Sequence, residues 1–373
     1  MQNQSTGNQR YIALDVLRGM TVAFMILVNN PGSWSHIYAP LEHAAWQGCT
    51  PTDLVFPFFL FVVGASMFFS FSKYGSHLNK GSLLKIGKRT LLIFAIGLFL
   101  NSFPQWSQDF SRLRIMGVLQ RIALAYGFSA LIALSVPRKY LPYLGGIILL
   151  AYWGLVVYAG GMNPYSLAEN PANPLDIALL GVNHLYKGFG IPFDPEGIFS
   201  TLPAVVTVLI GYLTGAVIKE TEKIKVPVKL AVFGIIAVVA GWLWGLYFPI
   251  CKAIWSSSYV LYTAGWASLL LGFLIWLIDL KGYSGWSTFF VVFGVNPLFI
   301  FAFSGLWARF LGRMIHLAGT DGKVVSGSTW LYNNIFVPVG GDLNGSLLYA
   351  IFHVLLFWLL GFVLFKKKIF IKV

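Results

Sequence analysis

The chain has 373 residues, of which 57% are hydrophobic and only 10% are charged, and its formal net charge at pH 7 is +13. Soluble globular proteins carry about 25% charged residues, so a water-soluble architecture is excluded and the bilayer is the expected solvent. The positive charge lies in short loops, as contact with anionic membrane lipid favours. No basic stripe interleaved with aromatic residues supports binding to nucleic acid.

Several long apolar runs match the length of about 20 residues that a helix needs to cross a bilayer. In chain order, these runs begin near Leu14, Asp53, Ile86, Met116, Tyr140, Phe199, Val228, Tyr259, Ser287 and Gly345. They lack the alternation of a membrane β-barrel, and an open sheet edge cannot face lipid. The sequence therefore predicts an all-α integral membrane protein, a polytopic bundle of about ten transmembrane helices that form one domain over residues 1–373.

Basic residues accumulate in the cytoplasmic loops of membrane proteins. Here they flank the first predicted helix and follow the second, fourth, sixth, eighth and last. They are Arg10, Arg18, Lys73, Lys80, Lys85, Lys88, Arg89, Arg138, Lys139, Lys219, Lys223, Lys225, Lys229, Lys281, Lys366, Lys367, Lys368 and Lys372. No Lys or Arg occurs from Gly19 to Ser72. We therefore expect both termini to be cytoplasmic and the loop between the first two helices to face outward.

Two long segments are expected on the outward side. The segment 161–198 contains Asn-Pro pairs that form turns, and the segment 311–344 is rich in glycine. Long loops on one face often carry a binding function, which favours a bulky or variable ligand there; loop growth without a function is the alternative. Cys49 and Cys251 also fall on outward segments, and two free thiols are expected rather than a disulfide.

Charged residues inside apolar runs are costly and need a reason. Asp15 and Arg18 lie three apart on one face of the first helix, where they are expected either to pair or to anchor the cytoplasmic end. In "RIMGVLQR", the residues Arg114, Gly117 and Arg121 are expected on one helix face, with Gly117 allowing another backbone to come close.

Arg121 is expected about two turns inside the fourth helix, where a buried arginine needs an anionic partner. Asp53 or Glu196 would serve Arg121 or Arg114 in a structural ion pair, and a bound anion is the alternative. In "FDPEGIF", Asp194 is expected to cap a helix, with Pro195 as its first residue and Glu196 in its first turn.

The pair Asn296-Pro297 lies inside a spanning run. Proline removes a hydrogen bond from the helix, so a kink is expected at this point, and the freed backbone groups need partners in protein or water.

The histidines on outward segments are His36, His43, His184 and His316. No zinc-type spacing of histidine or cysteine occurs, so no metal is expected, and neither a hydrolase elbow nor a phosphate-binding loop is present. A lone outward histidine is usually solvated. His43 differs in standing directly before the apolar stretch "DLVFPFFLFVVG".

Four stretches in order carry a resemblance to a known family: "ALDVLRGMTVAFMILVNN", "LEHAAWQGCTPTDLVFPFFLFVVGASM", "RIMGVLQRIALAY" and "FDPEGIFSTLPAVVTVLIGYLTG". They are similar to the heparan-alpha-glucosaminide N-acetyltransferase family, and specifically to bacterial members without the luminal domain. The similarity covers nearly the whole chain from Leu14. "LDVLRG" also occurs in membrane enzymes that O-acylate sugars, but those carry a histidine later in the first helix, where this chain reads "ILVNN".

The resemblance implies transfer of an acetyl group from cytoplasmic acetyl-CoA to the amine of a glucosamine-type sugar across a bacterial inner membrane. It also implies a possible homodimer in contact with lipid. The family's active histidine, in an H-x-x-W-x-G segment before "DLVFP", corresponds to His43, and the matching neighbours are Trp46, Gly48 and Asp53. Asn29 corresponds to the family's asparagine at the end of the first shared helix.

These residues suit acyl transfer. The imidazole of His43 can attack a thioester and hold the acetyl group, or it can accept the proton of an attacking amine, and both routes stay open. Asn29 is expected to donate to the developing oxyanion, and Asp53 to fix the ring tautomer. By position, Arg18, Lys88 and Arg89 are candidates for the phosphates of acetyl-CoA. The candidates for the sugar are Trp46, Arg114, Arg121, Asp194 and Glu196.

Two other functions compete with this hypothesis. The first is a membrane O-acyltransferase that modifies a glycan hydroxyl. The second is a transporter of amino sugars or muropeptides, which broken helices and inverted repeats would favour. No convincing internal repeat is evident in the sequence.

Overall fold

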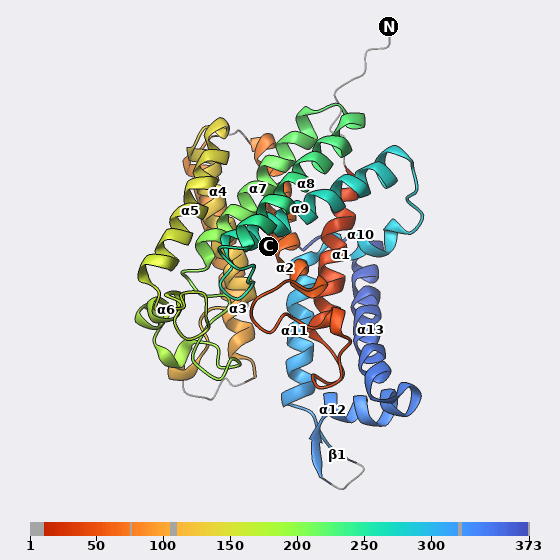
Figure 1. Ribbon diagram of the computed structural model, residues 1–373. Coiled ribbons are helices and arrows are strands. Elements are labelled where there is room, and N and C mark those ends of the chain that lie inside the picture. The colour runs from red at the N-terminus through yellow and green to blue at the C-terminus, as the bar shows by residue number, and fades with distance from the viewer. Residues whose placement is uncertain (1–10, 75–76, 105–109, 320–322, 372–373) are drawn as a thin grey trace.

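The computed structural model describes residues 11–74, 77–104, 110–319 and 323–371, so Arg10 and Lys372 lie outside the described residues. The longer helices are α1 (Ile12–Asn29), α2 (Pro51–Tyr74), α3 (Lys80–Ser102), α4 (Val118–Ser135), α5 (Leu141–Ala159), α7 (Thr201–Glu220), α8 (Val226–Gly245), α9 (Ser257–Leu274), α10 (Ser287–Val295), α11 (Pro297–Arg313) and α13 (Val337–Lys366). Two helices are shorter, α6 (Ala172–Leu180) and α12 (Gly327–Leu331). One antiparallel hairpin joins β1 (His316–Ala318) to β2 (Val324–Ser326). Figure 1 shows the elements as an elongated helical bundle.

Short turns of other helix types connect these elements. The 3-10 turns are η1 (Ala39–Leu41), η2 (Phe110–Arg112), η3 (Arg138–Tyr140), η4 (Val182–His184) and η5 (Lys223–Lys225), and the π-helical segments are η6 (Ile275–Leu280) and η7 (Tyr332–Phe336).

The chain is a multi-pass helical membrane protein, as predicted. Among the described residues, 8 helices are long and apolar enough to cross a membrane, or 9 when α10 and α11 are counted as one bent span. Helix α3 has 23 residues but falls outside this set, because its first half carries Lys80, Lys85, Lys88 and Arg89. With α3 included, the number of spans agrees with the sequence prediction of about ten.

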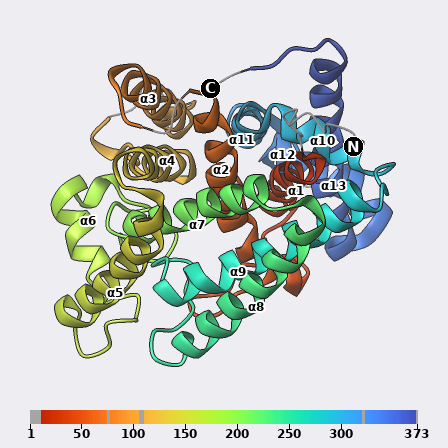
Figure 2. The same ribbon diagram turned by 90° about the horizontal axis from the view of Figure 1, so that it is seen from above.

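Glycine sets the spacing of the central helices. A Cβ atom on Gly64 of α2 would lie 1.9 Å from the carbonyl oxygen of Val208 in α7, and one on Gly211 of α7 would lie 2.0 Å from that of Phe61 in α2. The two backbones therefore touch, a packing mode that small residues permit in membranes. Figure 2 shows α7 running through the middle of the molecule, with α3, α4 and α5 toward one side and α1, α10 and α13 toward the other.

The predicted kink at Asn296-Pro297 is confirmed. Helices α10 and α11 meet there at an angle of 83°. The amide of Asn296 donates to the carbonyl oxygen of Ile369 at 2.9 Å and accepts from the backbone N–H of Ile371 at 2.8 Å. The asparagine therefore uses the break to bind the C-terminal segment.

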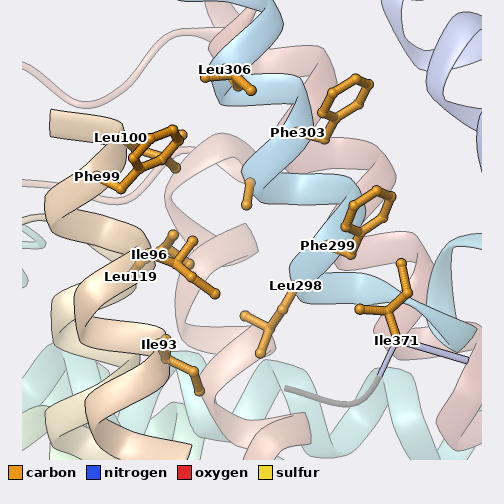
Figure 3. A pocket seen from close by; sticks show the side chains of 11 residues that line it. Ile93, Ile96, Phe99, Leu100, Leu119, Leu298, Phe299, Phe303, Leu306 and Ile371 are labelled. Carbon is orange, nitrogen blue, oxygen red and sulfur yellow. The ribbon is translucent and has the colours of Figure 1, made fainter. Parts of the chain in front are cut away.

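An apolar pocket of about 240 Å³ lies between α3 and α11 (Figure 3). Ile96 and Phe99 of α3 face Leu298 and Phe303 of α11 across it, and Ile371 from the C-terminal segment lies at one end. The lining side chains are apolar, so the pocket suits hydrocarbon and offers no group for acid, base or nucleophilic chemistry.

The two long segments that were expected on the outward side contain ordered structure. The segment 161–198 includes α6 and η4, and the segment 311–344 includes the β1–β2 hairpin and α12. Both lie at the same end of the bundle as the loop between α1 and α2, which is the lower end in Figure 1. A candidate site in that loop is therefore flanked by both segments.

Candidate active site

The site is centred on His43 and Asp53. His43 lies in the loop before α2 with its side chain 42% exposed, and Asp53 lies in the first turn of α2 with its side chain 1% exposed. Nδ1 of His43 is 2.7 Å from Oδ1 of Asp53. A buried carboxylate is therefore hydrogen-bonded to one edge of an accessible imidazole.

The other oxygen of Asp53 is occupied by the surrounding loop. Oδ2 accepts from the backbone N–H of Ala44 at 3.0 Å, and from the backbone N–H and the hydroxyl of Thr50, both at 3.1 Å. The carboxylate acts as acceptor throughout, so Nδ1 of His43 is the group that supplies the hydrogen between them. Nε2 then carries the lone pair and is left for a substrate.

Lys252, in the loop between α8 and α9, is a member of this cluster that the sequence did not predict. Its Nζ lies 3.3 Å from Oδ1 of Asp53, 2.9 Å from Nδ1 of His43 and 3.5 Å from Nε2. Burial lowers the pKa of Lys252, and the charge of Asp53 acts in the opposite direction. The available signal was that no other Lys or Arg occurs between Lys229 and Lys281.

Two hydrogen bonds, one from a backbone N–H and one from a tyrosine hydroxyl, join the segment around Lys252 to the segment around His43. The N–H of Gly48 donates to the carbonyl oxygen of Ile250 at 2.7 Å, in a bridge that pairs Gly48 with Cys251. Gly48 has a φ of 112°, which glycine adopts readily and other residues do not. The hydroxyl of Tyr259 in α9 donates to the backbone oxygen of Asp53 at 2.5 Å.

Both cysteines are free thiols, as expected, although the bridge between Gly48 and Cys251 brings their loops together. Burial raises the pKa of the Cys49 thiol to about 12 and that of Cys251 to about 11. The thiolate is the nucleophilic form of cysteine. These thiols are therefore unsuited to carry an acyl group near neutral pH.

Asn29 and Trp46 take different positions around this cluster. Asn29 is the last residue of α1 and is exposed, and no hydrogen bond joins it to His43 within the described part of the chain. Trp46 donates through Nε1 to the backbone oxygen of Tyr165 at 2.7 Å and packs edge-on against Phe193. It therefore ties the His43 loop to the outward segment 161–198.

Arg114 forms the second polar cluster of the outward end. Its guanidinium binds both oxygens of Asp194, at 2.9 and 2.7 Å, and Oε2 of Glu196 at 2.6 Å. The predicted pairing of an arginine with Glu196 is confirmed for Arg114. Burial opposes its charge, but Asp194 and Glu196 outweigh this effect and raise its pKa.

Two local predictions about this cluster were wrong. Arg114 does not share a helix face with Arg121, because Gly117 is extended and α4 begins only at Val118. Asp194 does not cap a helix, because α7 begins at Thr201 and the carboxylate is taken up by Arg114.

Arg121 lies in the first turn of α4, not two turns inside it, and its side chain is fully buried. Nη2 donates to the carbonyl oxygen of Gly197 at 3.1 Å and to the hydroxyl of Ser200, and the guanidinium lies 5.1 Å from the ring of Trp255. Within the described residues no carboxylate forms an ion pair with Arg121, so the predicted partner Asp53 is not in contact with it.

Of the residues expected to contact acetyl-CoA, Arg18 lies on α1, whereas Lys88 and Arg89 are neighbours on α3. Arg18 pairs with Asp15 at 3.1 Å, which confirms that pair, and also binds Ser66 at 2.7 Å and the backbone oxygen of Gly294 at 3.1 Å. It thereby links α1, α2 and α10.

Lys88 and Arg89 lie on α3. Lys88 is exposed, whereas the guanidinium of Arg89 lies 4.6 Å from the ring of Tyr126 in α4.

A cavity of about 1240 Å³ occupies the end of the bundle remote from His43. It lies among the last turns of α2, α4 and α7 and the start of α8. Its basic lining residues are Arg138, Lys139, Lys219 and Lys229. Its size and charge suit a large anionic ligand. Within the residues that the structure describes, no three His, Cys, Asp or Glu side chains are grouped to hold a metal ion.

Comparison with known proteins links this chain to one enzyme family. The sequence model described as "Heparan-alpha-glucosaminide N-acetyltransferase, catalytic" matches residues 10–244. The chain is 26% identical over 352 residues to heparan-alpha-glucosaminide N-acetyltransferase of Homo sapiens, covering 78% of this chain and 52% of that protein. It is 24% identical over 432 residues to the Mus musculus protein of the same name, covering 100% of this chain and 62% of that protein. The chain thus spans less than two thirds of the length of these relatives.

Proposed function

Because the chain belongs to the heparan-alpha-glucosaminide N-acetyltransferase family, we propose that it transfers an acetyl group from acetyl-CoA to the amine of a glucosamine-type sugar. The observation that carries the proposal is the pairing of His43 with the buried Asp53 at 2.7 Å, inside the part of the chain that the family model matches. The reaction forms an amide, and CoA leaves as the free thiol.

His43 is the acyl carrier or the base in this proposal. Asp53 holds the hydrogen on Nδ1, so the lone pair of Nε2 attacks the thioester carbon, or removes a proton from the sugar amine as that amine attacks. With a loop orienting Asp53 through Oδ2, the ring keeps one tautomer through either route.

The sugar is proposed to bind on the outward side. Trp46 offers an aromatic surface, and Arg114, Asp194 and Glu196 form a charged rim next to it. An amino sugar arrives largely as an ammonium ion, which carboxylates attract, and it gives up one proton to solvent before its nitrogen attacks. Arg121 lies beneath this rim and contributes by holding the loop at Gly197.

Acetyl-CoA is proposed to enter from the cytoplasm, with its phosphates in the basic cavity between the inner ends of α2, α4 and α7. Lys88 and Arg89 remain further candidates on the same side, whereas Arg18 acts through the packing of α1. The proposed setting is a bacterial inner membrane, with the protein surrounded by lipid and assembled as a homodimer.

The decisive experiment measures release of free CoA thiol from acetyl-CoA by the purified protein in detergent, with and without glucosamine. Release that depends on glucosamine and is lost in a His43→Ala variant supports the proposal. Mass spectrometry after alkaline hydroxylamine, which cleaves esters and spares amides, separates N-acetylation from O-acetylation. Absence of CoA release with every amino sugar tested, together with uptake of labelled amino sugar into liposomes, would replace the proposal with a transporter.

A further inference from the structure

We infer that Lys252 is a catalytic residue, whose ammonium group stabilises the negative charge that develops on the acetyl carbonyl oxygen beside His43. The inference rests on the proposed acetyl transfer and adds a third member to the site. It begins from a contact between residues that lie 209 positions apart in the chain.

The distances place the ammonium group over the imidazole ring. Nζ of Lys252 is 2.9 Å from Nδ1 of His43 and 3.5 Å from Nε2. A hydrogen bond along the in-plane lone pair of Nδ1 would leave Nζ much farther from Nε2 than from Nδ1. The Nδ1–H is directed at Asp53, so Nζ of Lys252 lies over the ring, nearer Nδ1 than Nε2 but within 3.5 Å of the reacting nitrogen.

The chemistry of acyl transfer creates a charge at this place. When a nucleophile bonds to the acetyl carbon, the carbonyl electron pair moves onto oxygen. It returns when the bond to sulfur breaks and the CoA thiolate leaves, later to take up a proton. In the two-step route the oxyanion forms on a carbon bonded to Nε2. In the direct route it forms next to Nε2 as that nitrogen takes the amine proton. A fixed cation near Nε2 stabilises the oxyanion in both routes.

The fold supplies no closer alternative among the expected donors. Asn29 was expected to serve the oxyanion, but it is exposed at the end of α1 and has no hydrogen bond to His43. Lys252 is held in place by Asp53 and by the bridge between Gly48 and Cys251, so its position is set before substrate binds. Preorganised donors of this kind contribute most to the stabilisation of transition-state charge.

The groups facing Lys252 predict how its charge depends on pH. They are His43 and Cys49 from the loop before α2, Asp53 from α2, and Glu196 from the segment before α7. Burial lowers the pKa of Lys252, while Asp53 and Glu196 favour its charged form. Activity that needs the ammonium ion should therefore fall on the alkaline side, at a lower pH than an ordinary lysine would set.

The test compares the wild type with Lys252→Met and with Lys187→Met, which removes an exposed lysine from the segment 161–198. In Lys252→Met we expect kcat to fall by about 10²–10³-fold, the loss typical of one oxyanion donor, with KM for acetyl-CoA changed little. Lys187→Met should keep the wild-type kcat. A Lys252→Met protein that keeps kcat within a few-fold of wild type overturns the inference.

A second variant keeps the inference testable if Lys252→Met fails to fold. Lys252→Arg retains a cation that does not lose its proton in the accessible pH range. Its residual activity should lack the alkaline decline that the wild type shows. An unchanged alkaline decline in Lys252→Arg would contradict a role for the Lys252 charge. Wild-type protein without acceptor-dependent CoA release would instead contradict the proposed function, so the two failures are distinct.

Discussion

The catalytic role proposed for His43 depends on one neighbour ten positions away, Asp53. Asp53 is buried at the start of α2, and the loop between the two residues supplies donors to its outer oxygen. Because both residues lie in one short segment, their proximity could be predicted from the sequence. Lys252 could not be found in that way, since only the packing of α9 against α2 brings its loop to the same point.

Replacing His43 should abolish transfer while leaving the fold intact. In His43→Ala we expect acceptor-dependent CoA release to fall by about 10²–10⁴-fold, the usual contribution of a general base. The change removes one hydrogen bond from the buried Asp53, which keeps Lys252 and its loop donors, so the free energy of unfolding should fall by about 1.5–3 kcal/mol. His36→Ala, at an exposed histidine of the same loop, is the control and should remain active. A His43→Ala enzyme with near wild-type turnover would refute this mechanism.

Arg114 has a larger structural role than His43, because its guanidinium binds both oxygens of the buried Asp194. The side chain of Asp194 is 0% exposed and that of Arg114 is 27% exposed. Removing one partner of a buried pair costs about 3–5 kcal/mol, so Arg114→Met should lower the free energy of unfolding by about this amount. Arg138→Met breaks the solvated pair with Glu220, which is 44% and 52% exposed, and should cost at most about 1 kcal/mol. Chemical unfolding in detergent measures the free energy of unfolding of both variants. Equal losses would contradict a larger contribution from the buried pair of Arg114 and Asp194.

At the scale of helices, the sequence predicted the existence and order of the spanning helices well, because the length of an apolar run is a strong signal. Predicted starts at Leu14 and Val228 lie two residues from the observed starts of α1 and α8. The wrong helix predictions lie in stretches that contain no long apolar run. The stretch before α4 was predicted to be helical, yet its residues bind Asn101 and Asp194 across the fold instead. Tertiary partners of this kind are not visible in local sequence.

The contact between α2 and α7 gives a prediction at this scale. Gly64→Ala would place a Cβ 1.9 Å from the carbonyl oxygen of Val208, so the two helices must separate. Overpacking of this kind costs about 1–3 kcal/mol, and α2 also positions Asp53, so activity should fall with stability. Gly146→Ala is the matched control, because nothing lies within 4 Å of its Cβ position on α5. The melting temperatures of the two variants in detergent test this prediction. A Gly64→Ala protein as stable as Gly146→Ala would show that α2 and α7 can separate without loss of stability.

For the whole molecule, the His43 site and the basic cavity lie at opposite ends of the bundle. Ser200, before α7, binds Arg121 near the His43 end, and Glu220, the last residue of α7, lines the cavity. A helix of 20 residues is about 30 Å long, which is the thickness of the hydrocarbon layer. In the proposed reaction, the thioester end of acetyl-CoA must therefore extend from the basic cavity between α2, α4 and α7 to reach Nε2 of His43.

This arrangement predicts a definite sidedness. In a background of Cys49→Ser and Cys251→Ala, a cysteine introduced by Ala45→Cys lies at an exposed position of the His43 loop, and one introduced by Lys139→Cys lies on η3 at the basic cavity. A membrane-impermeant maleimide added to intact cells should label the first variant and spare the second, which should react only after the membrane is opened. The basic loops predict this orientation, because lysine and arginine are enriched in cytoplasmic loops. The reverse pattern would put His43 on the side of the acetyl-CoA pool, and the enzyme would then have no need to carry an acetyl group across the membrane.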